Sequence, residues 1–503
     1  MDLTRREWLL AGGAWLGATS LGWGNPSRRV KTVSIFFTTD LHGHIEPTQT
    51  YDGIGDVGGM ARCVTQIREW KRQNPDSLLV DIGDVYQGTA VGLETDGTVM
   101  IDLFNRLGYD AWTIGNHDLD WGRGVIEGAL DRSTSAILTG NLTVDGRASD
   151  DASGPWKKVK PWMIKEVAGF RIGLIGVTTP GMPFWLAPET LDGVAVSDPA
   201  VCLKRSIAEL RAQKVDAVVA LGHMGWRFED DFANPVRTML SAAPGVDVYL
   251  AGHSHRDEPS FKVGETLCSQ ANYFGIHCGR VDLAFDAESR RLIDKRAFTV
   301  LMDSRFELDP AVMEAARPEL RRADEQLARK VCEVSSPLPE TGARSLRSLL
   351  CAAFAGALEK AGMPVDAVFH GTFGTGPVQA GDKTVRDCWE WLPYENLLVT
   401  AELTPLEIAA IVEEGSEQSD RDLWPMEVQR NGDGRIEAIL HGGRALEPGR
   451  RYRVALNSYD GQSGGRSMMK AREILFRPES KRELTGVATR DALIEYLLEK
   501  GTI

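Results

Sequence analysis

Residues 114–122 read IGNHDLDWG and place an amide, an imidazole and two carboxylates within five positions, at Asn116, His117, Asp118 and Asp120. The apolar run before them, 109–114, is typical of a strand. Four such polar groups cannot all face a hydrophobic core. The stretch therefore predicts a strand end at which a metal ion and a proton donor lie together, provided that other segments supply further ligands.

The flanking sequence alternates short apolar runs with helical segments. Strand-like runs cover 33–39, 78–82, 136–139, 171–177, 217–221 and 248–251, and helical spacing covers 58–73, 98–107 and 199–213. This alternation is typical of an α/β sheet. Ligands in layered α/β folds bind at the carboxyl ends of strands. Candidate functional side chains follow those ends: Asp40, His42, Asp84, Asn116, His117, His223, His253 and His255.

These residues combine carboxylates, one amide and imidazoles. Such a mixture suits two divalent ions, with zinc, manganese, iron and cobalt as the candidates. Two ions about 4 Å apart need a shared ligand, which is usually a carboxylate, and Asp84 is the candidate for that role. One Asp-x-His or Gly-His pair alone would indicate only a structural turn. Five motifs in order favour a two-metal site over a decayed or regulatory one.

The motifs D-x-H (40–42), GDxxQG (83–88), GNHD (115–118), GH (222–223) and GHxH (252–255) resemble those of the calcineurin-like metallophosphoesterases. With a separate C-terminal region, the chain resembles the bacterial 5′-nucleotidase group in particular. The resemblance implies a four-layer β-sandwich flanked by helices, plus a smaller α+β C-terminal domain. It also implies two ligand sets: Asp40, His42, Asp84 and His255 around one ion, and Asp84, Asn116, His223 and His253 around the other.

In this family the histidine of GNHD is not a ligand. The resemblance makes His117 a general acid held by Asp120, and a histidine oriented by a carboxylate is what general-acid chemistry requires. The alternative for Asp120 is a helix N-cap before Trp121. We expect Asp118 to be structural.

The family's second domain supplies substrate contacts, but this chain departs from its pattern. The slot of a phosphate-binding arginine holds Thr375, and one aromatic residue, Tyr459, precedes Gly464-Gly465-Arg466. The candidate substrate contacts are Asn141, Phe373, Trp424, Tyr459 and Arg466. For the aromatic candidates the alternative is core packing, and for Arg466 it is a surface cation.

The chain has 503 residues, too many for a single core. Residues 1–28 contain Arg5-Arg6 and an uncharged Gly/Ala/Leu-rich run, which predicts a twin-arginine export signal and a periplasmic or cell-envelope location. An uncleaved membrane anchor is the alternative. We expect a catalytic domain over 29–308, a connecting charged helix over 309–331 and a substrate domain over 332–503.

A net charge of −14 argues against nucleic-acid partners and anionic membrane surfaces. We expect a small phosphoester substrate, in the first place a nucleotide, and a stable membrane partner only if the leader stays uncleaved. The sequence leaves the oligomeric state open. The seven cysteines contain no CxxC pair, so they indicate no zinc knuckle, and a Cys268–Cys278 disulfide stays open.

The prediction is a hydrolase with two divalent metal ions that releases phosphate from nucleotides or related phosphomonoesters by attack of a metal-bound hydroxide. The alternatives within enzymes are a 2′,3′-cyclic phosphodiesterase or 3′-nucleotidase, a sugar-nucleotide hydrolase and a thiosulfohydrolase. Outside enzymes, the alternative is a metal-dependent protein that binds a phosphorylated ligand.

Overall fold

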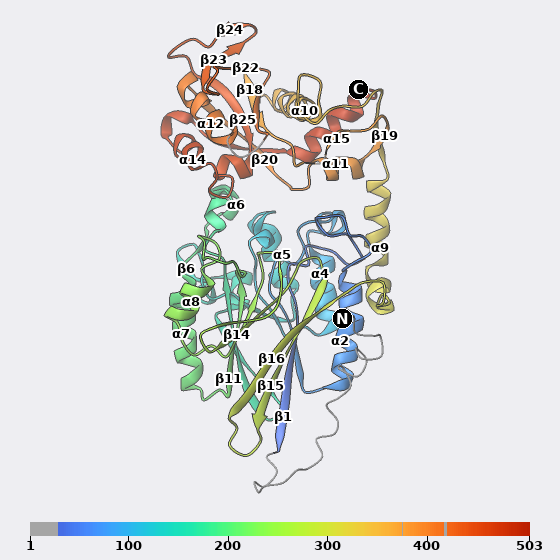
Figure 1. The fold of residues 1–503 in the computed structure, drawn as a ribbon, viewed down its shortest axis with the longest axis vertical. Coiled ribbons are helices and arrows are strands. Elements are labelled where there is room, and N and C mark those ends of the chain that lie inside the picture. The colour runs from blue at the N-terminus through green and yellow to red at the C-terminus, as the bar shows by residue number, and fades with distance from the viewer. Residues whose placement is uncertain (1–28, 375, 417–419) are drawn as a thin grey trace.

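The computed structural model describes residues 29–374, 376–416 and 420–503 (Figure 1). The predicted export signal over 1–28 and Thr375 lie outside the described residues. Among the helices within these ranges, none is long and apolar enough to cross a membrane.

Two β-sheets face each other in the N-terminal part of the chain. The first has the order β16 (Leu292–Leu301), β15 (His277–Asp286), β1 (Val30–Thr38), β2 (Ser77–Asp81), β3 (Ala111–Trp112), β4 (Ala136–Leu138) and β7 (Val159–Lys160). The second has the order β13 (Asp257–Val263), β14 (Thr266–Ala271), β12 (Val248–Ala251), β11 (Ala217–His223), β9 (Phe170–Thr178) and β8 (Trp162–Val167).

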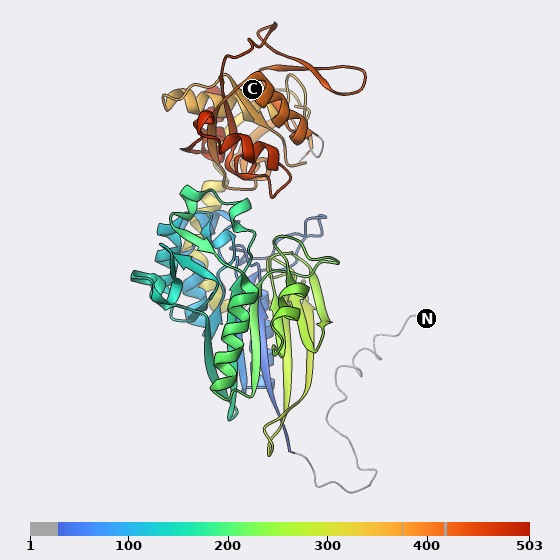
Figure 2. The same cartoon turned by 90° about the vertical axis from the view of Figure 1, so that its left-hand side faces the viewer.

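Alternating side chains on each strand separate two kinds of core. In β1, Val33, Ile35 and Phe37 point into the core between the sheets, whereas Phe36 points outward beneath helices. Helices α2 (Met60–Gln73), α4 (Thr98–Leu107) and α5 (Arg123–Arg132) cover the first sheet, and α7 (Pro199–Ala212) and α8 (Val236–Ala242) cover the second. Figure 1 shows these layers from left to right, and Figure 2 views the domain from the side of α7 and α8. The predicted four-layer fold is confirmed.

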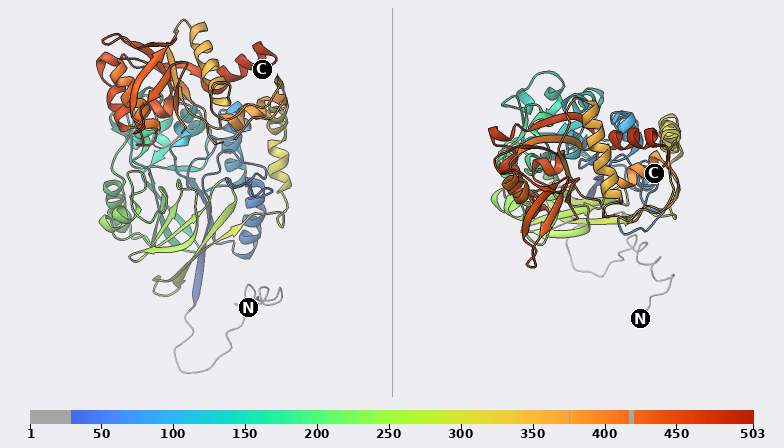
Figure 3. Two further views of the ribbon diagram at one scale, coloured as in Figure 1. Left: turned by 45° about the horizontal axis from the view of Figure 1, so that its top comes forward. Right: turned by 90° about the horizontal axis from the view of Figure 1, so that it is seen from above.

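Strands β1 to β4 run parallel, as do β9, β11 and β12, so their carboxyl ends meet at one edge of the sandwich. The C-terminal part of the chain lies over that edge (Figures 1 and 3). The loops that carry the predicted ligands therefore face it.

The C-terminal domain has a five-stranded sheet between two helical layers. Its order is β21 (Asp422–Trp424), β18 (Ala367–His370), β25 (Tyr452–Asn457), β20 (Leu397–Leu403) and β26 (Glu483–Ala488). One face packs against α10 (Leu346–Lys360) and α15 (Thr489–Lys500), and the other against α12 (Pro405–Ser416) and α14 (Met469–Leu475). This is the predicted α+β domain.

Three elements differ from expectation. The charged helix α9 (Pro310–Leu327) ends earlier than predicted, because the following residues form strand β17 (Lys330–Val334), which pairs with β19 (Gly381–Thr384). The expected strand over 109–114 shrinks to β3. The predicted glycine-rich loop 458–467 begins with a short helix, α13 (Ser458–Gln462), because the Asn457 side chain caps it by accepting from the N–H of Asp460.

The two domains are joined by hydrogen bonds as well as by α9. The carbonyl of Pro183, in the short helix η4 (Met182–Phe184), accepts from Gln462 Nε2 at 2.8 Å and Arg472 Nη1 at 2.9 Å. The carbonyl of Phe184 accepts from Ser463 Oγ at 2.6 Å. The acceptors of these three hydrogen bonds are all main-chain carbonyls.

All seven cysteines are buried and unpaired. Cys268 lies in the outer core of the second sheet and Cys278 in the outer core of the first. The disulfide that the sequence left open between them is not formed, because the two side chains belong to separate cores.

Candidate active site

The predicted ligands converge into two groups that share one carboxylate. Asp40, His42, Asp84 and His255 form one group, and Asp84, His223 and His253 form the other; within each group the ligand atoms lie within 4.8 Å of one another. Asp84 belongs to both, as a bridging ligand must.

The facing atoms lack the partners that buried polar atoms normally have. His42 Nε2 and His255 Nε2 are 3.1 Å apart, and His223 Nε2 lies 3.0 Å from Asp84 Oδ2. In the described part of the chain, His223 Nε2, Asp84 Oδ2 and Asn116 Oδ1 are buried without a hydrogen-bond partner. Imidazole nitrogens, carboxylates and an amide oxygen that face one another fit a pair of divalent cations.

Backbone carbonyls orient two of the imidazoles. The Nδ1 atoms of His42 and His223 lie 2.8 Å from the carbonyls of Gln87 and Ile82. A proton on each Nδ1 leaves Nε2 as a lone-pair donor that faces the site, which is the usual arrangement around a metal-ligating histidine.

The ligand residues adopt an unusual backbone. Asp40, His42, Asp84, His253 and His255 have φ values of 51°, 48°, 54°, 70° and 53°. Non-glycine residues rarely adopt this left-handed region, and each instance costs on the order of 1–3 kcal/mol. The surrounding contacts therefore hold these side chains in place at an energetic cost, which is typical of functional sites.

Asp118 is one of those surrounding contacts. Its carboxylate accepts from the backbone N–H groups of Asp84 at 3.0 Å, Val85 at 2.8 Å and Gly115 at 2.7 Å. It thus fixes the loop that carries Asp84 to the loop that carries Asn116, the structural role expected of it.

His117 and Asp120 form a pair beside the ligand groups. His117 Nδ1 lies 2.7 Å from Asp120 Oδ2. Burial disfavours the charged imidazole, but the carboxylates of Asp120 and Asp84 outweigh that effect and raise the pKa of His117 to about 10. Cations bound at Asp84 would lower it again. Helix α5 begins after Gly122, so Asp120 is not its N-cap.

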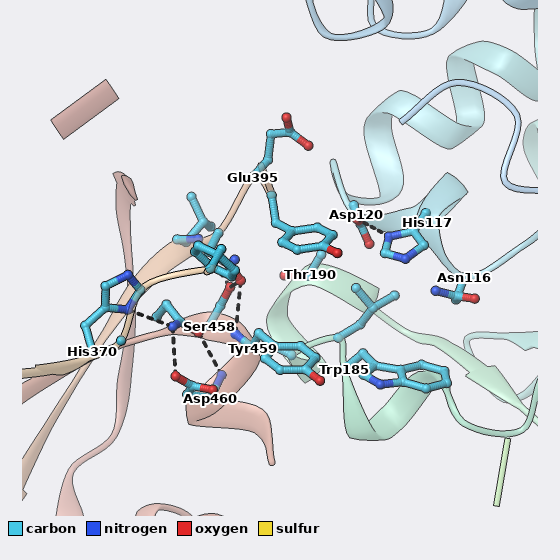
Figure 4. Close-up of a pocket in the computed structure, with 18 of the residues that line it drawn as sticks. Asn116, His117, Asp120, Trp185, Thr190, His370, Glu395, Ser458, Tyr459 and Asp460 are labelled. Atoms are coloured by element: carbon cyan, nitrogen blue, oxygen red, sulfur yellow. Dashed lines mark hydrogen bonds and ion pairs between the residues drawn. The ribbon is translucent and has the colours of Figure 1, made fainter. Parts of the chain in front are cut away.

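A cleft of about 490 Å³ separates this site from the C-terminal domain (Figure 4). Asn116, His117, Asp120 and His253 line one wall, and His370, Phe373, Tyr394, Arg421 and Tyr459 line the other. The cleft has the size of a typical small-molecule site.

Of the five predicted substrate contacts, the structure brings Phe373 and Tyr459 to the cleft and leaves three away from it. Asn141 is buried, and its amide is used by Ser197 and by both backbone groups of Thr178. Trp424 pairs with Val368 in the sheet and packs on the α10 face. The guanidinium of Arg466 lies over the rings of Phe184 and Phe232, at 5.1 and 5.0 Å. It therefore packs at the domain interface.

The sequence interpretation missed Arg421 and Tyr394 in the cleft wall. Arg421 makes a two-pronged ion pair with Asp460, with Nε–Oδ2 and Nη2–Oδ1 distances of 2.9 and 2.7 Å. The available signal was the arginine just before the Asp-Leu-Trp-Pro segment and the tyrosine of the 392–396 turn.

Comparison with known proteins agrees with this geometry. Residues 33–257 match the family model of the calcineurin-like phosphoesterases, the class that the fold and the ligand groups define. Residues 333–472 match the 5′-nucleotidase C-terminal domain. The chain therefore belongs to the calcineurin-like phosphoesterases that carry a 5′-nucleotidase C-terminal domain.

Human 5′-nucleotidase is 29% identical over 60% of this chain and 54% of its own length, so the chain spans about half the length of the curated relatives it matches. A Thermus thermophilus 5′-nucleotidase precursor has 24% identity and a TM-score of 0.69, covering 94% of this chain and 97% of that one. The sulfate thiohydrolase SoxB from Thermus thermophilus has 17% identity and a TM-score of 0.62, covering 96% of both chains. These structures show a shared fold.

Proposed function

We propose that this protein hydrolyses phosphoesters, most directly nucleotides or related phosphomonoesters, at a site for two divalent metal ions. One observation carries the proposal: two ligand groups share Asp84 beside the His117–Asp120 pair, on the wall of a cleft that a second domain closes. The names of the curated relatives support the choice of nucleotides.

Each residue has a proposed role in this reaction. One ion is assigned to Asp40, His42, Asp84 and His255, and the other to Asp84, Asn116, His223 and His253. Zinc, manganese, iron and cobalt are the candidate metals. When bound, such ions polarise phosphoryl oxygens and activate water.

His117 acts on the leaving group. The Asp120 carboxylate accepts a hydrogen bond from the protonated Nδ1 of His117, so that Nε2 is the nitrogen free to donate. Transfer of the Nε2 proton to the leaving oxygen neutralises the charge that develops there. The paired carboxylate also favours the charged imidazole, which is the form that can donate.

The opposite wall is proposed to hold the organic part of the substrate. Phe373 and Tyr459 are each more than a third exposed although both line the cleft, so their rings are available to a base. Arg421, ion-paired with Asp460, lies in the same wall.

We also propose the chain organisation expected from the sequence. Residues 1–28 would be a twin-arginine signal that sends the protein to the periplasm, followed by a catalytic domain over 29–308, a connector over 309–331 and a substrate domain over 332–503. The paired arginines and uncharged run of the leader support the export route.

A substrate panel on metal-reconstituted protein tests the activity. We expect phosphate release from nucleoside monophosphates, ahead of cyclic nucleotides, sugar nucleotides and thiosulfate adducts. Tyr459→Ala should raise KM for a nucleotide, whereas Leu498→Ala, an exposed site on α15, should leave it unchanged. A metal-loaded protein that turns over no phosphoester would instead be a binding protein, and hydrolysis restricted to thiosulfate adducts would identify a thiosulfohydrolase.

A further inference from the structure

The histidines of the ligand groups are not all held by the same kind of partner. His42 and His223 are held at Nδ1 by backbone carbonyls. His255 Nδ1 instead lies 2.9 Å from the hydroxyl of Tyr51. Tyr51 belongs to the loop between β1 and α2 and is 65% exposed, so a surface side chain holds this imidazole.

Tyr51 itself is held in place by Tyr273. The two rings stack with centroids 4.4 Å apart at 18°, and the ring of Tyr273 also stacks on His255 at 5.1 Å and 23°. The backbone N–H of Tyr51 donates to the Tyr273 hydroxyl at 3.0 Å. The hydroxyl of Tyr51 is therefore aimed at His255 by a fixed contact.

The loop has its own internal bonds as well. Thr48 and Val57 form an antiparallel bridge, and the backbone N–H groups of Thr50 and Gly53 donate to Ile54 and Thr50. Since these bonds involve only the backbone, changing the end of the Tyr51 side chain leaves them in place.

We propose that Tyr51 is a positioning residue that sets the metal affinity of the group formed by Asp40, His42, Asp84 and His255; this rests on the proposed two-metal function. A histidine that binds a metal through Nε2, the atom by which His255 faces the group, needs its lone pair there and its proton on Nδ1. The Tyr51 oxygen accepts a hydrogen bond from the Nδ1–H group and so fixes both the tautomer and the ring orientation of His255.

The difference in partner has a consequence for the two groups. The side chain of His255 is 22% exposed, whereas those of His42 and His223 are 5% and 0% exposed. Water can replace a hydroxyl on a surface loop as the hydrogen-bond partner more readily than it can replace a buried carbonyl. The group that contains His255 is therefore the one whose affinity depends on the 48–57 loop, while the group of His223 and His253 does not.

Metal titration of the full chain tests this without measuring turnover. Apoprotein is titrated with Zn²⁺ against a chromophoric chelator, and the absorption of the Co²⁺-substituted protein is recorded. Tyr51→Phe keeps the ring and its stacking but removes the acceptor. We expect one of the two ions to bind about 10–100-fold more weakly, the other to bind as in the wild type, and the cobalt bands of one ion to change.

Two further variants on the same cluster sharpen the test. Ile54→Ala is the matched control, since Ile54 is an exposed residue of the same loop, and it should bind both ions as the wild type does. Tyr273→Phe removes the bond to the Tyr51 N–H but keeps the stack, and should have a smaller effect on the same ion.

Wild-type binding of both ions by Tyr51→Phe would overturn the assignment. Equal weakening of both ions would overturn it too, because it would show a general disturbance. Failure of the wild type to bind two ions, or to hydrolyse any phosphoester after binding them, would count against the proposed function instead.

Discussion

His370 is a buried histidine of the C-terminal domain that we expect to make this protein acid-labile. It lies on β18, is 2% exposed and accepts at Nδ1 from Asn457 Nδ2 at 3.0 Å. Burial lowers its pKa to about 4. Asn457 also donates to Asp460, the partner of Arg421, so protonation of His370 would disturb the cleft wall.

The sign and size of the effect follow from that pKa. Between pH 6.5 and 4 the unfolded chain binds a proton at His370 that the folded chain does not, so stability falls as the pH falls through this window. Lowering the pH from 7.5 to 5 should cost about 2 kcal/mol, rising to about 3 kcal/mol below pH 4. Above about pH 7.5 the residue should have no pH-dependent effect.

The substitution His370→Asn isolates the contribution of this histidine to the pH dependence of stability. Its amide oxygen can accept from Asn457 in place of Nδ1, but it does not titrate. The smaller side chain should cost roughly 1–2 kcal/mol at every pH, while the loss between pH 7.5 and 5 should shrink by about 2 kcal/mol relative to the wild type.

Urea unfolding at pH 7.5, 6.5, 5.5 and 5 measures the slope of unfolding free energy against pH for the wild type and for His370→Asn. His441→Asn, at an exposed position on β23 (Ile436–His441), is the matched control and should keep the wild-type slope. A His370→Asn protein with the same pH dependence as the wild type would refute the reasoning, because some other group would then carry the acid sensitivity.

Three further outcomes are expected. His117→Ala should keep its metal content by elemental analysis and lose about 10²–10⁴-fold in kcat; unchanged turnover would remove it from the mechanism. Gly115→Ala should lower metal content, because a Cβ there would overlap the Asp84 carboxylate, whereas Gly124→Ala, with open space around it, should not. Arg490→Met should destabilise the protein by about 3–5 kcal/mol in urea unfolding, since it leaves the mostly buried Glu395 carboxylate without its 2.6 Å ion pair; a loss below about 1 kcal/mol would argue that this carboxylate is neutral or hydrated.

The fold and the metal ligands could be predicted because both depend on patterns within short stretches of sequence. Each ligand follows an apolar strand within a few residues, and parallel strands bring those ends to one edge whatever the details of the loops. The shared position of Asp84 followed from the same pattern. The pairing of His117 with Asp120 needed only their spacing of three residues in the short helix η1 (His117–Leu119) and its cap.

The far wall of the cleft could not be predicted in the same way. Whether Arg466 faces substrate or packs on Phe184 depends on how two domains dock, and no local pattern records that. Trp424 and Asn141 show the same limit, since each is used by a neighbouring strand or loop that is distant in sequence. Tyr51 went unnoticed because a lone exposed tyrosine has no distinguishing neighbours.

The docking contacts at η4 affect which residues of the domain interface can change in sequence. Pro183 and Phe184 offer main-chain carbonyls to Gln462, Ser463 and Arg472. A substitution at Pro183 or Phe184 changes the side chain but leaves the acceptor oxygen, so these hydrogen bonds themselves tolerate changes in sequence. Each of the three donors is a side chain that one mutation can delete. For these three hydrogen bonds, selection should therefore act on the donor side, whereas compensating pairs of mutations are expected at the side-chain contacts of the same interface, Arg466 with Phe184 and Arg482 with Glu189.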